Sequence, residues 1–120
     1  MRSSELECIV YDILTEYDVP FEEEYEFPDL IASSGRALRF DFACFDDDGD
    51  LDFLIEVQGR QHYNAVSKFG GAKGVKRQKY NDLQKRKYCQ KNNIKLVIIP
   101  YTDFDSNRVN YDYIMMKAGY

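Results

Sequence analysis

Residues 51–63, LDFLIEVQGRQHY, join an apolar strand to a short run of polar side chains. The first half of this stretch is nearly continuous in apolar residues, which is typical of a strand covered on both faces of a sheet. Glu56 and Gln58 lie near the end of the strand, and His62, the only histidine of the chain, follows four residues after Gln58. A carboxylate, an amide and an imidazole in this order can bind a metal ion and activate water.

A second strand is predicted over residues 37–45, because apolar side chains alternate there with Arg39, Asp41 and Ala43. The run at 46–50, with its Asp-Gly pair, is a strong hairpin signal. Asp41 and Glu56 are therefore expected on adjacent strands. Two carboxylates in that position suit Mg²⁺, which takes oxygen ligands. The alternative is that Asp41 points to solvent on a half-exposed strand.

Local patterns predict the elements outside this hairpin. The expected elements are a helix from a capping box at Ser4 to the Val19-Pro20 step, a strand over 21–27, a loop over 28–35, a glycine-containing loop over 64–74, a basic helix over 75–92, a strand over 95–99 and a helix over 109–117. A helical crossover between the third and fourth strands implies a mixed sheet. The predicted fold is α/β, a mixed β-sheet flanked by helices in the order α-β-β-β-α-β-α.

The composition of the 120 residues is that of one soluble domain spanning 1–120, with 44% hydrophobic and 31% charged residues. No apolar run approaches the roughly 20 residues that would cross a membrane, and no signal core precedes a cleavage site. We therefore expect a cytoplasmic protein. The cysteines Cys8, Cys44 and Cys89 lack the spacing of a metal site and are expected to be buried thiols in a reducing compartment.

The net charge of −5 conceals a strong segregation of charge along the chain. Residues 60–95 contain eleven basic residues and one acid, Asp82, so this segment carries +10 and the remainder −15. Such an electrostatic face is typical of a protein that binds a polyanion. We expect DNA contacts from a set of basic residues in this segment: Arg60, Lys73, Lys76, Arg77, Lys79, Lys85 and Arg86.

Two further acids have both a structural and a functional interpretation. Glu7 stands three residues after Ser4, where it could simply complete the capping box. Asp82 is spaced by seven residues from both Val75 and Cys89, so the three share one face of the predicted helix. An acid between two apolar positions is expected to face inward or toward a site. His62 is either a general base, a metal ligand or a structural histidine.

Four stretches together resemble the PD-(D/E)XK nuclease superfamily: residues 39–42, 55–63, 77–89 and 91–101. They are most similar to the branch that contains the very-short-patch mismatch repair endonucleases and the phage homing endonucleases described as EDxHD. The resemblance covers the chain from about residue 4 to residue 101. It implies a restriction-endonuclease-like core and Mg²⁺-dependent hydrolysis of phosphodiester bonds, with Mn²⁺ able to substitute.

The resemblance also implies a role for individual side chains. It places Glu7, Asp41, Glu56, Gln58, His62 and Asp82 in the catalytic site, with Asp41, Glu56 and His62 as metal ligands. This sequence departs from the pattern at Gln58, where the superfamily commonly has a lysine. His62 would then supply the function of that lysine.

The leading hypothesis is a Mg²⁺-dependent DNA endonuclease encoded by a phage or another mobile element and acting in the host cytoplasm. The chain has almost no room for a separate recognition domain, so specificity would come from its own loops, from a homodimer or from a protein partner. The alternative is a catalytically inactive nuclease-fold protein that binds DNA or a host protein. An RNA-directed nuclease ranks lower, because the sequence has no RNA-specific module.

Overall fold

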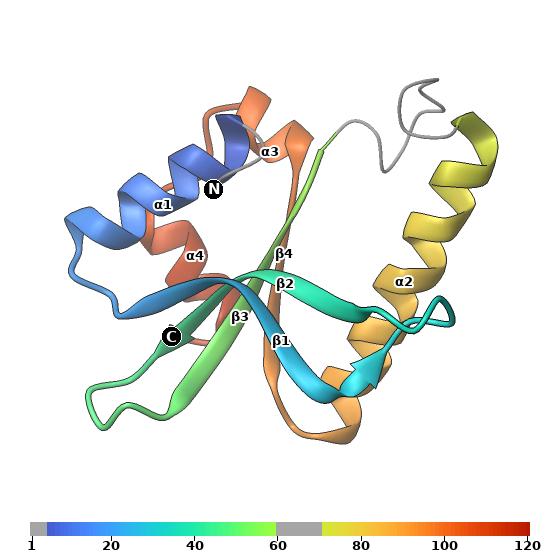
Figure 1. Cartoon of the computed structure of the whole chain (residues 1–120). Coiled ribbons are helices and arrows are strands. Elements are labelled where there is room, and N and C mark those ends of the chain that lie inside the picture. Colours follow the sequence, from blue (N-terminus) through green and yellow to red (C-terminus); the bar gives the residue numbers. More distant parts are fainter. Residues whose placement is uncertain (1–4, 60–70) are drawn as a thin grey trace.

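The computed structural model describes residues 5–59 and 71–120. Their helices and strands follow the order α1 (Glu5–Glu16), β1 (Phe21–Ile31), β2 (Ala37–Phe45), β3 (Leu51–Gln58), α2 (Gly71–Lys91), β4 (Lys95–Pro100), α3 (Tyr101–Asp105) and α4 (Tyr111–Lys117) (Figure 1). None of the helices in these described ranges is long and apolar enough to span a bilayer. Ser4, Arg60 and His62 lie outside the described residues.

The four strands form one mixed sheet in the order β1-β2-β3-β4. β1, β2 and β3 are antiparallel neighbours, whereas β3 and β4 are parallel and are joined through α2. This confirms the predicted α/β class and the predicted crossover. Consecutive strands that pair directly need only short turns, while the parallel pair requires a long connection across a face of the sheet.

The hairpin between β2 and β3 has the predicted bounds. Asp46 closes its turn, because its Oδ1 atom accepts hydrogen bonds of 3.0 Å from the backbone N–H groups of both Asp48 and Asp50. Gly49 adopts a φ of +84°, which a glycine reaches without the steric cost of a Cβ atom. The Asp-Gly signal in the sequence therefore acts through a specific turn geometry.

The first strand is longer than the sequence predicts. The loop expected over 28–35 is wrong at its start, because β1 continues through Pro28 to Ile31. β1 is an edge strand, where a proline without an N–H group is tolerated. The pairing with β2 shifts register between Glu26 and Ile31, which accommodates the proline.

Two helix starts and one additional helix also differ from the prediction. Residues 71–74 belong to α2 and not to a loop, so the helix includes the buried Gly74 despite the poor helix propensity of glycine. α3 was not expected and begins directly after Pro100, whose extended backbone precedes the helix as its N-cap. α4 begins at Tyr111 and not at 109, because the Asn110 side chain accepts a 2.8 Å hydrogen bond from the N–H of Tyr113.

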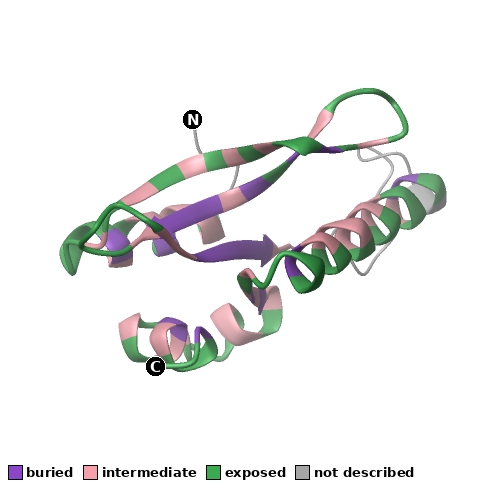
Figure 2. Ribbon diagram, turned by 90° about the horizontal axis from the view of Figure 1, so that it is seen from below, coloured by how far each residue is buried: buried purple, intermediate pink, exposed green. Residues whose placement is uncertain are grey.

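The sheet carries a different apolar core on each face. α1 and α4 cover one face, where Leu14 and Ile114 pack with Phe42 and Ile55 of the strands. α2 covers part of the other face, and its Cys89 belongs to the cluster on that side. Figure 1 shows the sheet between these two layers of helices, and Figure 2 shows that the buried segments concentrate in the central strands.

β2 changes the face to which its apolar side chains point. Leu38 and Phe40 belong to the core beneath α2, whereas Phe42 and Cys44 belong to the core beneath α1 and α4. Regular alternation would place all four on one face, as the sequence predicts, so that prediction is wrong. The phase changes at Asp41, and this distortion positions the candidate site.

Candidate active site

Asp41 and Glu56 meet where β2 separates from β3. The backbone pairing of the two strands ends at Phe42 and Ile55, so Asp41 and Glu56 would form the next pair. Instead, the N–H of Asp41 donates to Oε1 of Glu56 at 3.0 Å, and the N–H of Val57 donates to Oδ2 of Asp41 at 2.6 Å. Two carboxylates thus replace the backbone ladder at the fork between the strands. This satisfies the backbone donors that the separation would leave unpaired.

The distortion at this fork extends into β1. Glu23 pairs with Phe42 and Tyr25 pairs with Phe40, so Glu24 lies opposite Asp41. Glu24 has a φ of +50°, in the left-handed region that side-chain-bearing residues rarely adopt. Irregular backbone on two adjacent strands therefore surrounds the point where Asp41 is presented.

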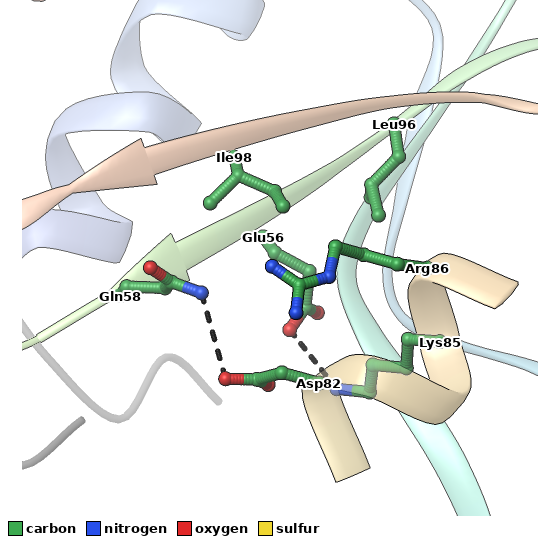
Figure 3. A pocket seen from close by; sticks show the side chains of 7 residues that line it. All are labelled: Glu56, Gln58, Asp82, Lys85, Arg86, Leu96 and Ile98. Atoms are coloured by element: carbon green, nitrogen blue, oxygen red, sulfur yellow. Dashed lines mark hydrogen bonds and ion pairs between the residues drawn. The ribbon is translucent and has the colours of Figure 1, made fainter. Parts of the chain in front are cut away.

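Lys85 of α2 forms a buried ion pair with Glu56. Its Nζ atom lies 3.0 Å from Oε2 of Glu56, and the two side chains are 13% and 8% exposed (Figure 3). The ammonium group also lies 5.5 Å from the centroid of the Phe40 ring. Lys85 was expected among the DNA contacts. Its amino group is directed into the site, where it compensates the buried carboxylate.

Gln58 and Asp82 form a second polar pair beside the first. Nε2 of Gln58 lies 3.5 Å from Oδ2 of Asp82, which is long for a hydrogen bond (Figure 3). These two residues line one pocket with Glu56 and Lys85, and the pocket continues past Arg86 toward β4. The structure therefore places Asp82 toward the site, as its spacing in the sequence predicts.

Burial and mutual repulsion dominate the electrostatics of the two carboxyl groups. Burial, followed by the nearby charge of Glu56, raises the pKa of Asp41 to about 8. Glu7 adds to this rise, whereas the Val57 N–H and Lys85 oppose it. Burial also raises the pKa of Glu56, against the opposing charge of Lys85. The site has too little positive charge to ionise both acids easily at neutral pH.

The predicted site residues divide into three groups. Asp41, Glu56, Gln58 and Asp82 come together at the fork and the adjoining pocket, and Glu7 lies within electrostatic range of Asp41. His62 and Arg60 lie outside the described residues. The remaining predicted DNA contacts are exposed on α2: Lys73, Lys76, Arg77, Lys79 and Arg86.

A divalent cation fits this donor set in part. Asp41 offers a hard oxygen ligand. Its pKa is raised in the metal-free protein, and a nearby cation would lower it again and so favour the ionised form. Both oxygens of Glu56 already accept hydrogen bonds, from the Asp41 N–H and from Lys85, so Glu56 fits less well as a direct ligand. Within 5–59 and 71–120, no group of three or more His, Cys, Asp or Glu side chains is arranged to hold a metal.

The ion pair between Lys85 and Glu56 was not predicted from the sequence, where Lys85 was expected only as a DNA contact. A signal for it existed, because Lys85 stands three residues after Asp82 on the same helix, and residues three apart share a helix face. If Asp82 faces the site, Lys85 does so too. Because Lys85 is one of eleven basic residues in this segment, the sequence did not single it out as the partner of a buried acid.

Comparison with known proteins gives one informative similarity. The chain is 46% identical over 71 residues to a protein of Frog virus 3 (isolate Goorha) described as "Uncharacterized protein 094L". The aligned part covers 58% of this chain and 43% of the viral protein, so the chain spans less than half of that relative's length. No protein-family model and no solved structure matches the chain.

Proposed function

We propose that this protein is a Mg²⁺-dependent DNA endonuclease with a restriction-endonuclease-like core. The observation that carries the proposal is the fork, where the carboxylates of Asp41 and Glu56 lie together beside the ammonium group of Lys85. Burying a carboxylate in a sheet costs free energy unless the group is paired, hydrogen-bonded or bound to a metal ion. The strand order, with a helical crossover before β4, supports the same core. The similarity to a viral protein is compatible with a viral or mobile-element gene.

Asp41 would be the principal metal ligand in this proposal, with His62 as the predicted second ligand or base. A bound Mg²⁺, or Mn²⁺ in its place, polarises a phosphate and lowers the pKa of water. Lys85 would favour the ionised form of Glu56 and offer its remaining N–H donors to the phosphate that is cleaved. Lys85, which comes from α2, would thus supply the cation that the superfamily commonly has at the strand position of Gln58.

The exposed cations of α2 would hold the DNA backbone near this fork. α2 bears Lys73, Lys76, Arg77 and Lys79 in exposed positions, before the turn that carries Asp82 and Lys85. Lysine and arginine contacts to phosphates provide affinity that does not depend on sequence and that falls with salt. The acidic remainder of the chain would keep the duplex away from the other surfaces.

Cleavage of plasmid, nicked and branched DNA tests the enzyme. Wild-type protein is expected to cleave with Mg²⁺ or Mn²⁺, and Asp41→Asn is expected to be about 100-fold slower, since about 3 kcal/mol of charge stabilisation is lost. Asp12→Asn removes an exposed carboxylate of α1 and serves as the matched control. Activity that survives both Asp41→Asn and His62→Ala contradicts the mechanism. The same reactions with RNA separate a DNA nuclease from an RNA nuclease.

The hydrogen bonds that Glu56 already accepts favour a second candidate function. The chain would then be a nuclease-fold protein that binds DNA or a host protein without cleaving. The two oxygens of Glu56 are held by internal donors, which leaves Asp41 as the principal carboxylate available to a cation. Titration calorimetry with Mn²⁺ separates the candidates. Heat of binding that disappears in Asp41→Asn supports the enzyme. DNA or protein binding with no Mn²⁺ binding supports the inactive form.

A further inference from the structure

A groove lies along β4, next to the fork. The pocket beside Glu56 and a second cavity of about 250 Å³ share Arg86, Leu96 and Ile98. The second cavity is completed by Cys89, Gln90 and Ile94. The β3–β4 register places Ile98 beside Glu56 (Figure 3), so the second cavity lies next to the candidate site.

The groove is apolar on its floor and polar on its rim. Ile94, Leu96 and Ile98 are only half-buried, and β4 is an edge strand of the sheet. Burial raises the pKa of the Cys89 thiol to about 11, so this wall is uncharged at neutral pH. Arg86 and Gln90 are exposed on α2 and provide a planar cation and an amide at the rim.

The size and charge of the groove indicate its occupant. A cavity of about 250 Å³ lies just below the usual range of small-molecule pockets, which suits a single planar ring system better than a larger ligand. The basic surface of α2 adjoins it, so a ligand with an anionic backbone and an apolar ring is favoured. A nucleotide has both features. Bases in an intact duplex are stacked and cannot enter a recess of this kind.

We propose that the groove receives one unpaired nucleotide of DNA, with its base against Leu96 and Ile98 and its phosphate on Arg86. This inference rests on the proposed function and deepens it, because it names the substrate class. The preferred substrate is DNA with an extrahelical or single-stranded nucleotide next to the phosphate that Asp41 and Lys85 face.

The test measures binding by the Asp41→Asn protein, so that cleavage does not interfere. The probes are a fully paired duplex and the same duplex with one bulged 2-aminopurine, compared by fluorescence anisotropy and by the emission of the unstacked base. The bulged duplex is expected to bind about tenfold more tightly, because the base buries apolar surface of Leu96 and Ile98. Adding Gln90→Trp fills the groove and is expected to abolish this preference while leaving affinity for the paired duplex unchanged.

Met116→Trp is the matched control, because Met116 is 64% exposed on α4, on the other face of the sheet. It is expected to keep the tenfold preference. Equal affinity for the two duplexes, or a preference that survives Gln90→Trp, overturns the inference even when wild-type protein cleaves paired DNA. Failure of the proposed function looks different: wild-type protein then cleaves none of the DNAs. A dimer in sedimentation that Gln90→Trp dissociates identifies a second copy as the occupant and also overturns the inference.

Discussion

The two faces of the sheet differ in what they bury. Beneath α1 and α4 the described core consists of apolar side chains, including Leu14, Phe42 and Ile114. Beneath α2 the sheet holds the Glu56–Lys85 ion pair and borders an open groove. Both faces bury apolar side chains, but the larger buried cluster lies beneath α1 and α4. The other face can then carry buried charge, which rarely stabilises a fold by itself.

Breaking the ion pair is expected to have the largest effect on stability. Lys85→Met leaves Glu56 buried without its cation, so the free energy of unfolding should fall by about 3 to 5 kcal/mol in urea titration. The double variant Lys85→Met with Glu56→Gln should recover most of this loss, because no unpaired charge remains. Lys87→Met, at an exposed position of the same helix, should change stability by less than about 0.5 kcal/mol. An equal loss of stability in Lys85→Met and Lys87→Met would show that the ion pair with Glu56 has no specific effect on stability.

The pH dependence of stability is expected to come from the same face. In metal-free protein the folded pKa of Asp41 is about 8, above the ordinary value of 3.8, so the folded state binds the proton more tightly than the unfolded chain. The free energy of unfolding should therefore fall as pH rises between these values, by at most about 1.4 kcal/mol per pH unit, or about 2 to 3 kcal/mol from pH 5 to pH 7.

Asp41→Asn should remove the part of this slope that Asp41 contributes and stabilise the metal-free protein at pH 8, whereas the part due to Glu56, whose pKa burial also raises, should remain. The exposed substitution Asp12→Asn should leave the slope unchanged. Urea midpoints measured in EDTA across this range check both expectations. Stability that rises with pH in the wild-type protein would contradict the burial of Asp41 as the cause.

The apolar face should respond to substitution without any effect on chemistry. Asn110→Ala removes the side-chain cap of α4, so the free energy of unfolding should fall by about 1 kcal/mol. Asn110→Ser keeps a capping oxygen and should lose less. Thermal denaturation measures the change, and DNA binding and cleavage at 25 °C should equal those of the wild type. A loss of activity in Asn110→Ala would show that the two faces are coupled.

Regular sequence patterns made the hairpin predictable, but they did not predict the change of face at Asp41. The alternation over 37–45 and the Asp-Gly turn predicted β2 and β3 with their observed bounds. The change of face at Asp41 coincides with the separation of β2 from β3, and no local pattern in the sequence marks it. The short helix α3 was missed because the sequence marks only where β4 ends, at Pro100.

The sequence by itself determined the α/β class, the crossover and most of the acids that meet at the fork, since these follow from local periodicity, turn chemistry and charge. Only the tertiary structure decided that Lys85 pairs with Glu56 and that a groove extends along β4. It also decided that the carboxylates of Asp41 and Glu56 accept hydrogen bonds from backbone N–H groups of the two strands. The physical reason is that these features arise between segments distant in the chain. Their energies depend on burial and on distances of a few ångströms, which the order of residues does not specify.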